Sequence, residues 1–341
     1  MIKWNDFLSA QGAVLKDGEL QSFGDSQSEL ASANGNIITS LSHLGLLEVI
    51  GEDAVTFLQG QVTNDVKKLD GSVSQYAGYC NSKGRLLALF LAFAHADHLH
   101  LQMPISILEP MMKRLKMYVM RSKVEISDKS TEILCFGIAG PNAESTLTTL
   151  FNKAPQAPQQ LITVDDATLL RLTGDTPRYQ VFTHVVNAER IWNALSANCT
   201  KVGKSIWDYL EIHAGIPEIV PSTQEAFVPQ MVNLDSLDGI NFKKGCYTGQ
   251  EIVARTHYLG KVKRRTQLAH IDTEEIPLAG DAIHLVGHEE AIGQVVRAAP
   301  APNGGVDALI EIRLENLDSS DEFPVWKGKK LEFKALPYAL N

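Results

Sequence analysis

The 341-residue chain is poor in the features that mark several protein classes. Its longest apolar run, residues 86–94, is about half of what a helix needs to cross a bilayer. The first residues lack the apolar core of a signal peptide. The four cysteines are Cys80, Cys135, Cys199 and Cys246, and at least 46 residues separate neighbouring ones. Because no CxxC pair is present, the sequence indicates neither a sequence-local zinc site nor a small disulfide scaffold. We therefore expect a soluble protein of a reducing compartment, in the cytoplasm, with no membrane partner.

Several catalytic patterns are also missing. The sequence has no HExxH, no GxxxxGK[ST] and no Ser/His/Asp order. His95, His98 and His100 cluster beside an apolar strand, where a turn or edge role is favoured over metal binding. We expect no metal site.

Charge is unevenly distributed along the chain. The net charge is -9, which argues against a general nucleic-acid binder. Residues 243–265 nevertheless hold seven basic residues against Glu251 alone, a net of +6, so the rest of the chain carries -15. Such a segment is typical either of a solvated surface or of a local polyanion site. The basic residues are Lys243, Lys244, Arg255, Lys261, Lys263, Arg264 and Arg265.

The hydrophobic pattern predicts a mixed α+β chain. Residues 20–36 are polar and small, and indicate a flexible connection. Strands are expected at 45–50, 73–79 and 86–94, with a short helix over 52–59. A helical spacing from Ile105 to Val119 contains Pro110, which we interpret as marking the start of the main helix.

Two further units follow in the pattern. From about Thr131, the order strand, helix, strand, strand, helix fits a ferredoxin-like split βαβ unit. After Arg265, many short strand-like runs separated by turns predict a small barrel.

The most unusual segment is Lys244-Gly245-Cys246-Tyr247-Thr248-Gly249-Gln250-Glu251. Glycines allow close backbone approach and unusual dihedral angles, and nearby ammonium groups favour a thiolate, the nucleophilic and metal-binding form of cysteine. The alternative is that Cys246 is a small apolar residue in a strand-to-helix turn. Cys80 is a weaker candidate, and the other two cysteines lie in apolar surroundings.

Two other residues suggest a heteroaromatic ligand. Trp207 lies beside the apolar face of an expected helix, and is either a packing residue or a flat wall against a ligand ring. Glu218 follows Gly215-Ile216-Pro217 and is able to accept paired hydrogen bonds from an amino-pyrimidinone edge.

At these residues the chain resembles the YgfZ-type folate-binding proteins, relatives of the glycine-cleavage T-protein. The octapeptide 244–251 carries the resemblance, and residues 57–65, 80–85, 121–124 and 214–217 support it. The resemblance implies three domains around a central folate channel. It divides the chain into an N-terminal extension or linker (1–36), a folate-binding domain (37–130 plus 216–262), a ferredoxin-like domain (131–215) and a C-terminal β-barrel (263–341).

The resemblance also implies a function and its residues. Tetrahydrofolate or a one-carbon derivative would bind, and the protein would support iron–sulfur client enzymes and, through them, tRNA modification. Cys246 would be the functional thiol, with Lys244 beside it. The implied folate contacts are Trp207, Glu218, Gln250, Glu251 and Arg255, and a tRNA contact would use Lys261, Lys263, Arg264 and Arg265.

Two departures from the family bear on the activity. Residues 44–47 offer no aromatic side chain near the first strand, where relatives often stack the pterin. Aminomethyltransferases carry acidic residues just after the turn equivalent to 82–84, where this chain has Arg85. We therefore expect an accessory factor rather than an aminomethyltransferase, with one-carbon transfer and RNA binding through 243–265 as the alternatives.

Overall fold

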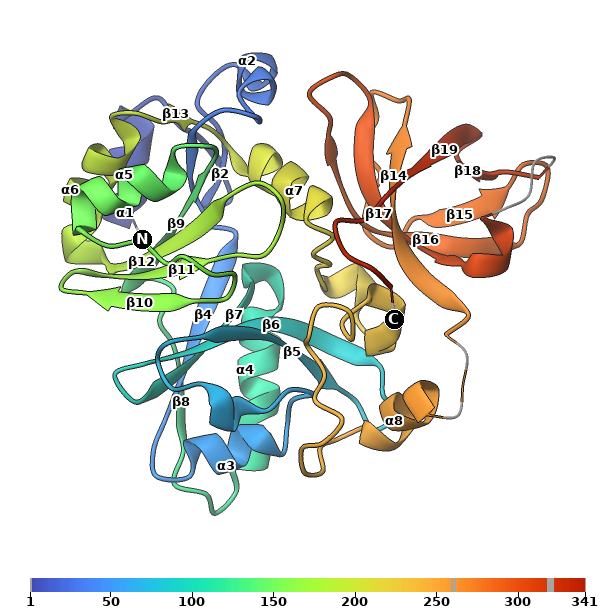
Figure 1. Ribbon diagram of the computed structural model, residues 1–341, viewed down its shortest axis with the longest axis horizontal. Coiled ribbons are helices and arrows are strands. Elements are labelled where there is room, and N and C mark those ends of the chain that lie inside the picture. The colour runs from blue at the N-terminus through green and yellow to red at the C-terminus, as the bar shows by residue number, and fades with distance from the viewer. Residues whose placement is uncertain (1, 259, 261, 318–321, 341) are drawn as a thin grey trace. The chain divides into compact units, whose positions relative to one another are not determined.

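The computed structural model describes residues 2–258, 260, 262–317 and 322–340. It confirms the mixed α+β class and the C-terminal barrel (Figure 1). The chain divides into two compact units, which we describe separately. Unit 1 comprises Met1–Phe57, Val66–Gln75 and Leu91–Leu210, and unit 2 comprises Leu58–Asp65, Tyr76–Phe90 and Glu211–Asn341.

A six-stranded sheet in unit 1 has the order β10-β11-β12-β9-β3-β13. The pairs β11–β12, β12–β9 and β9–β3 are antiparallel, whereas β3 and β13 are parallel. The order β11-β12-β9-β3 is that of a ferredoxin-like sheet. The bounds are β3 Ile37–Ser40, β9 Ile133–Ala139, β10 Leu161–Val164, β11 Ala167–Arg171, β12 Arg178–His184 and β13 Thr200–Lys201. The expected order of elements after Thr131 is therefore present, but strand β3 comes from a part of the chain about a hundred residues earlier.

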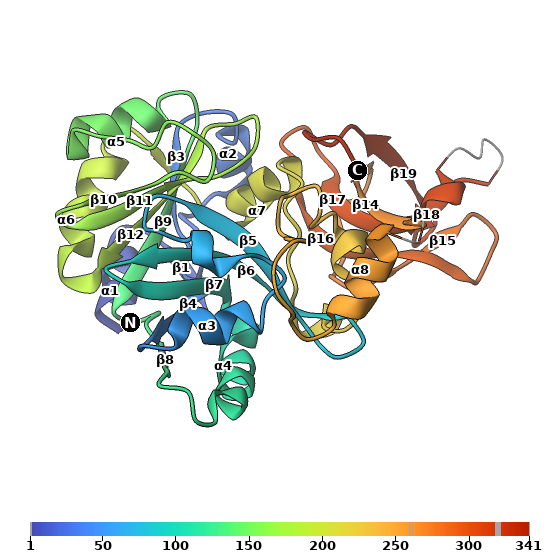
Figure 2. The same cartoon turned by 60° about the horizontal axis from the view of Figure 1, so that its bottom comes forward.

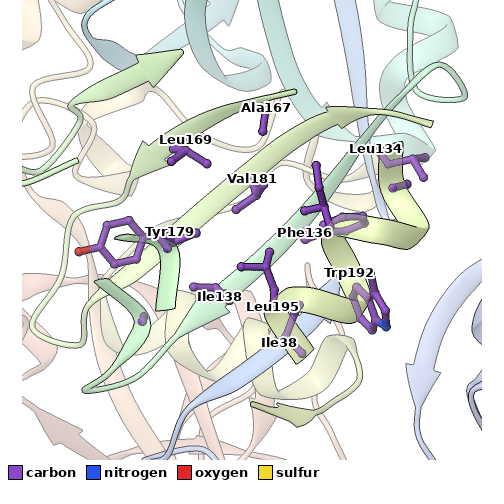
Figure 3. Packing of buried hydrophobic residues seen from close by; sticks show 14 of the residues in the cluster. Ile38, Leu134, Phe136, Ile138, Ala167, Leu169, Tyr179, Val181, Trp192 and Leu195 are labelled. Atoms are coloured by element: carbon purple, nitrogen blue, oxygen red, sulfur yellow. The ribbon is translucent and has the colours of Figure 1, made fainter. Parts of the chain in front are cut away.

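Helices α5 (Ala143–Phe151) and α6 (Val185–Ser196) cover one face of this sheet (Figure 2). Their apolar positions recur at three- and four-residue spacing, so one stripe of each helix is buried. Trp192 of α6 meets Phe136 of β9 edge to face, with ring centroids 5.3 Å apart. Figure 3 shows these side chains in the core, together with Tyr179 and Val181 of β12.

The N-terminal segment is folded, contrary to the expectation of a flexible connection over 20–36. Helix α1 (Ile2–Ala10) buries Trp4 and Leu8 in the core of the six-stranded sheet. Strands β1 (Val14–Lys16) and β2 (Glu19–Ser22) form a hairpin, and α2 (Ser26–Ala31) begins at the N-cap Asp25, whose carboxylate accepts from the Gln27 N–H. The small polar residues of this segment therefore belong to regular elements: Asp25 and Ser32 cap α2, and Ser26 and Ser28 lie within it.

A second sheet has the order β5-β6-β7-β4-β8. Its strands are β4 Leu44–Ile50, β5 Ser74–Cys80, β6 Leu86–His95, β7 His98–Pro104 and β8 Glu125–Asp128, and α3 (Ala54–Gln59) follows β4. Helix α4 (Ile105–Val119) packs against β4, β7 and β8. The interpretation of Pro110 as a helix start is wrong, because α4 begins five residues earlier and contains it. Pro110 is the sixth residue of α4, where it removes the N–H that would pair with the carbonyl oxygen four residues earlier.

Unit 2 contains the closed barrel, with the order β14-β17-β16-β15-β18-β19 and the pair β14–β19 completing the ring. Alternate side chains point inward, and Ala269, Val295, Ile310 and Trp326 lie in its core. The bounds are β14 Arg264–Ile271, β15 Ala282–Leu285, β16 Ala291–Pro300, β17 Val306–Arg313, β18 Pro324–Trp326 and β19 Lys329–Lys334. Helices α7 (Lys204–His213) and α8 (Gln250–Tyr258) precede the barrel in the chain.

Candidate functional site

Lys244 is the inner anchor of the loop that carries Cys246. Its side chain is buried, at 9% exposure, and its ammonium group donates to three main-chain carbonyl oxygens. These belong to Gln59, Val62 and Asn64, at 2.7, 2.6 and 2.8 Å. Burial lowers the pKa of Lys244 to about 8, while Asp65 acts in the opposite direction. At neutral pH the ammonium is protonated, so all three of its N–H groups have partners.

The chain segment whose carbonyl groups accept from Lys244 is itself held by hydrogen bonds within unit 2. The Thr63 hydroxyl donates to the Gly239 carbonyl at 2.6 Å, and the Asn64 amide donates to the carbonyl oxygens of Tyr76 and Asp238 at 2.9 and 2.7 Å. Residues 59–64 and Lys244, which lie in two stretches that the resemblance rests on, are therefore joined by hydrogen bonds within unit 2. Lys244 thus positions the loop, and its charge is directed at the carbonyl oxygens rather than at the thiol.

The other side of the loop is held by Tyr247 and Gly249. The Tyr247 ring is buried 5.2 Å from the Lys244 ammonium, and burial raises the pKa of its hydroxyl. Gly249 has φ +83°, and a Cβ atom there would lie 2.4 Å from the carbonyl oxygen of Asn81. Glycine is therefore required at 249 both by backbone conformation and by close approach.

Gly245 and Cys246 project between these two anchors. Cys246 is exposed, and it has no hydrogen-bond partner among the described residues. A Cβ atom at Gly245 would meet nothing within 4 Å, so the expected close approach occurs at Gly249 but not at Gly245. The loop presents one thiol to solvent on a backbone that is fixed on both sides.

The remaining cysteines are unsuited to this role. Burial raises the pKa of Cys80 to about 12 and that of Cys199 to about 11, and it raises the pKa of Cys135 as well. Their thiols stay protonated at neutral pH, and a protonated thiol is a poor nucleophile. This finding removes Cys80 as a candidate.

The turn at 80–85 provides the surface on which the loop rests. The side-chain oxygen of Asn81 accepts from the main-chain N–H groups of Lys83 and Arg85, which closes the turn. Arg85 donates to the Ala226 carbonyl at 2.6 Å. A guanidinium group therefore stands directly after this turn, and it is engaged with a main-chain carbonyl oxygen.

Helix α8 begins directly after the loop and carries three expected folate contacts. Gln250 is half-buried at its first position, whereas Glu251 and Arg255 are exposed. The buried Gln230 amide donates to the Val253 carbonyl at 2.7 Å and ties the helix to its support. The acidic residue in the first turn and the basic residue in the last turn both suit the helix dipole.

Trp207 lies in unit 1 as a packing residue. It is 1% exposed, and its ring covers Gly137 of β9 so closely that a Cβ atom there would lie 2.6 Å from the indole. The Arg178 guanidinium is 5.6 Å from the ring centroid. The packing alternative thus describes the position of this side chain, and its role as a folate contact stays a prediction.

Glu218 lies in unit 2, in the segment after α7. It is half-buried, and its carboxylate has no hydrogen-bond or ion-pair partner among the described residues. A partly desolvated carboxylate with free lone pairs is a suitable acceptor for paired N–H groups. This is the property expected of a residue that binds an amino-pyrimidinone edge.

The basic segment 243–265 is less available to a polyanion than its charge suggests. Arg265 is 2% exposed and forms a two-point ion pair with Asp235 at 2.5 and 2.9 Å. Arg264 forms a two-point ion pair with Glu311. The expected tRNA contact through Arg265 is therefore wrong, since a buried and paired guanidinium cannot reach a phosphate. Lys263 is exposed, and Lys261 lies outside the described residues.

Among the described residues, no group of three or more His, Cys, Asp or Glu side chains is arranged to hold a metal ion. Within the same part of the chain, no helix combines the length and the apolar character needed to cross a membrane.

The fold places the chain in a recognisable structural class. Residues 24–162 match the GCVT N-terminal domain family. The structure of glycine cleavage system aminomethyltransferase T from Bartonella henselae is similar, with a TM-score of 0.74, 17% identity, and coverage of 97% of this chain and 96% of that one. The chain thus has the fold of the glycine-cleavage T-proteins.

Sequence relatives identify the family within this class. The tRNA-modifying protein YgfZ of Serratia proteamaculans (strain 568) is 32% identical over 308 residues, which is 89% of this chain and 92% of the relative. The proteins of that name from Photorhabdus laumondii subsp. laumondii and Escherichia coli (strain SE11) are 32% and 31% identical, again over 89% of this chain and over 93% and 94% of their own lengths. The chain belongs to the YgfZ family.

Proposed function

We propose that this protein is a folate-binding tRNA-modification factor in the cytoplasm that supports iron–sulfur enzymes, with Cys246 as its functional thiol. The exposure of Cys246 on a loop anchored by Lys244 and Tyr247 carries the proposal. A thiol held in this way can meet a sulfur atom, a cluster or an oxidised group on a client protein without local unfolding. The name of the relatives, tRNA-modifying protein YgfZ, supports the link to tRNA.

The residues of this chain offer partial support for a folate. Glu218 has the free carboxylate that a pteridine edge requires, while Trp207 is covered by its own neighbours. Tetrahydrofolate, when bound, would supply a carrier for one-carbon units. Glu218 would orient its pteridine through paired hydrogen bonds, and Gln250 lies at the start of the helix that follows the thiol loop.

Titration calorimetry with tetrahydrofolate tests the folate part of this proposal. We expect the wild-type protein to bind and Glu218→Gln to bind at least tenfold more weakly, because the amide replaces one of the two acceptor oxygens. Glu289→Gln, at an exposed carboxylate in a barrel loop, is the matched control and should bind as the wild type does. Absence of binding to the wild-type protein would contradict the proposal.

An aminomethyltransferase activity is not favoured by the site. Arg85 takes the position of the acidic residue, and its guanidinium is bound to a carbonyl oxygen. We expect no turnover of aminomethyl-lipoyl protein in the presence of tetrahydrofolate. Measurable turnover would replace the accessory role by an enzymatic one.

Direct RNA binding through 243–265 is the other alternative. Three basic residues of the segment, Lys244, Arg264 and Arg265, are engaged within the protein. Among the described residues of the segment, the basic side chains that remain exposed and able to contact phosphates are those of Lys243, Arg255 and Lys263. Filter binding of tRNA at several salt concentrations measures the number of such contacts. A steep salt dependence that is lost on neutralising these three residues would favour the RNA-binding alternative.

A further inference from the structure

The segment that carries Glu218 is held at its start by a buried carboxylate of the barrel. Asp307 of β17 is 2% exposed, and its Oδ2 lies 2.7 Å from Nε2 of His213, the last residue of α7. Both residues belong to unit 2. Glu218, the carboxylate that we propose for the pteridine edge, follows His213 by five residues.

Two further side chains donate to Asp307. His270 Nδ1 lies 2.7 Å from Oδ1, and Lys334 Nζ lies 3.0 and 3.2 Å from the two carboxylate oxygens. Burial by itself would raise the pKa of Asp307, but the hydrogen bonds from the three donors outweigh burial and hold the pKa below its usual value. The carboxylate is therefore ionised at neutral pH and only accepts, which places a hydrogen on His213 Nε2.

Of these three donors, His213 is the one that lies outside the barrel strands. His270 is the register partner of Asp307 on the neighbouring strand β14, and Lys334 lies on β19, which pairs with β14. Those two contacts therefore join strands that the sheet already holds together. His213 is at the end of a helix, so its hydrogen bond ties the chain that follows α7 to the barrel.

A Schellman motif ends α7 directly after His213. Gly215 has φ +68°, and its N–H donates to the Ile212 carbonyl at 2.9 Å. The Ile216 N–H donates to the Glu211 carbonyl at 3.0 Å, which completes the motif. The main chain after His213 therefore leaves the helix along a fixed path.

A further hydrogen bond and two buried side chains continue this path to Glu218. The Tyr338 hydroxyl donates to the Gly215 carbonyl at 2.7 Å. Pro217 and Ile219 are buried on either side of Glu218, which is itself half-buried. The segment is thus attached at its start, at its turn and on both sides of the carboxylate.

We propose that Asp307 is a positioning residue for the folate site: through His213 it holds the start of this segment on the barrel, and so fixes the Glu218 carboxylate for the paired N–H groups of a pteridine edge. The inference rests on the proposed folate function. A carboxylate accepts paired hydrogen bonds only where both of its oxygens are in line with the two donors. A loosened segment therefore loses binding even though Glu218 itself is unchanged.

Amide hydrogen exchange on the full chain tests the attachment without any ligand. In His213→Leu, the Gly215 and Ile216 amides should exchange at least tenfold faster than in the wild-type protein. His213→Gln keeps a side-chain N–H at the position of Nε2 and should exchange as the wild type does. His270→Leu removes a donor from the same carboxylate inside the barrel, and as the matched control it should leave these two amides unchanged. Unchanged exchange in His213→Leu, or equal acceleration in both leucine variants, would overturn the inference.

Titration calorimetry with tetrahydrofolate on the same folded variants tests the consequence for binding. We expect His213→Leu to bind at least tenfold more weakly, and His213→Gln and His270→Leu to bind within twofold of the wild type. Glu218→Gln should cost less in the His213→Leu background than in the wild-type protein, since both changes act on one contact. Wild-type binding by His213→Leu, or additive losses in the double variant, would contradict the positioning role.

The two measurements separate this inference from the function on which it rests. If the wild-type protein does not bind tetrahydrofolate, the proposed folate function fails, and with it the role of Asp307 in binding. If the wild-type protein binds and His213→Leu binds equally well, the folate function stands and the positioning role alone is overturned. The exchange rates decide in either case whether the contact between His213 and Asp307 holds the segment.

Discussion

At the scale of single residues, burial separates four chemically identical thiols into two groups. Cys246 is exposed, while burial raises the pKa of Cys80, Cys135 and Cys199. The sequence indicated Cys246 as the functional thiol because its lysine neighbours were expected to favour the thiolate. In the structure, the lysine at 244 has a different role. Lys244 does not face the thiol, and its ammonium fixes the backbone through three carbonyl oxygens.

This difference predicts selective alkylation of the native protein. Iodoacetamide at neutral pH should modify Cys246 first, because a thiolate must form and be reached for the reaction to occur. Peptide mass spectrometry over a time course measures the rate at each cysteine, and the denatured protein serves as the control in which all four react. Labelling of Cys80 or Cys199 at the same rate would contradict the description.

His100 gives a pH dependence whose sign follows from its burial. Its pKa is lowered from the model-peptide value of 6.5 to about 4, mainly by loss of solvation. Between these values the unfolded chain binds a proton that the folded chain does not, so the free energy of unfolding falls as the pH falls from 6.5 to 4. The loss should total on the order of 3 kcal/mol.

Urea unfolding at pH 6.5, 5.5 and 4.5 measures this loss. His100→Phe should reduce the slope of unfolding free energy against pH over this window, since the variant has no imidazole to protonate. Equal slopes for the two proteins would show that His100 is accessible to protons in the folded state.

At the scale of elements, the loop 244–251 acts as a rigid support between two anchored points. Gly249 is locked by its φ of +83° and by the Asn81 carbonyl oxygen, whereas Gly245 has free space around it. The two glycines are indistinguishable by sequence reasoning, because their difference arises from a turn more than 160 residues away. Similarly, the sequence does not indicate the pairing of Ile37–Ser40 with β9, because the two strands lie about a hundred residues apart in the chain.

The glycine pair provides a matched experiment. Gly249→Ala should lower the free energy of unfolding by roughly 2–3 kcal/mol, because the backbone at 249 cannot adopt φ +83° without strain and the new methyl group meets a main-chain oxygen. Gly245→Ala should leave stability nearly unchanged. Urea unfolding of both variants checks the prediction, and equal stability losses would contradict the anchored loop.

At the scale of the whole molecule, the chain is acidic, and two arginines of its basic segment, Arg264 and Arg265, are paired with carboxylates of the same chain. The sequence predicted the alternation of strands and helices, the barrel and the family, because these depend on local periodicity and on contiguous motifs. It missed the folded segment 20–36, which is rich in small polar residues and whose Phe23 packs against a distant core that includes Trp192. It also missed the buried ion pair of Arg265, since its partner Asp235 lies 30 residues away.

That ion pair makes neutralisation of the basic segment a test of stability as well as of RNA binding. Arg265→Gln should lower the free energy of unfolding by about 3 kcal/mol, because the Asp235 carboxylate is left buried without its partner. Lys263→Gln, at the exposed position two residues earlier, should change stability by less than about 0.5 kcal/mol. Urea unfolding measures both, and a neutral effect of Arg265→Gln would show that this side chain is free in solution.

The central claim is that the Cys246 thiol performs the function and that the rest of its loop holds it in place. The most direct measurement is the activity of an iron–sulfur enzyme, together with the level of a dependent tRNA modification, in cells whose own copy of this gene is deleted. Cells carrying Gly245→Ala should regain the activity, and cells carrying Cys246→Ser, expressed at the same level and equally stable, should not. Full recovery with Cys246→Ser would contradict the account.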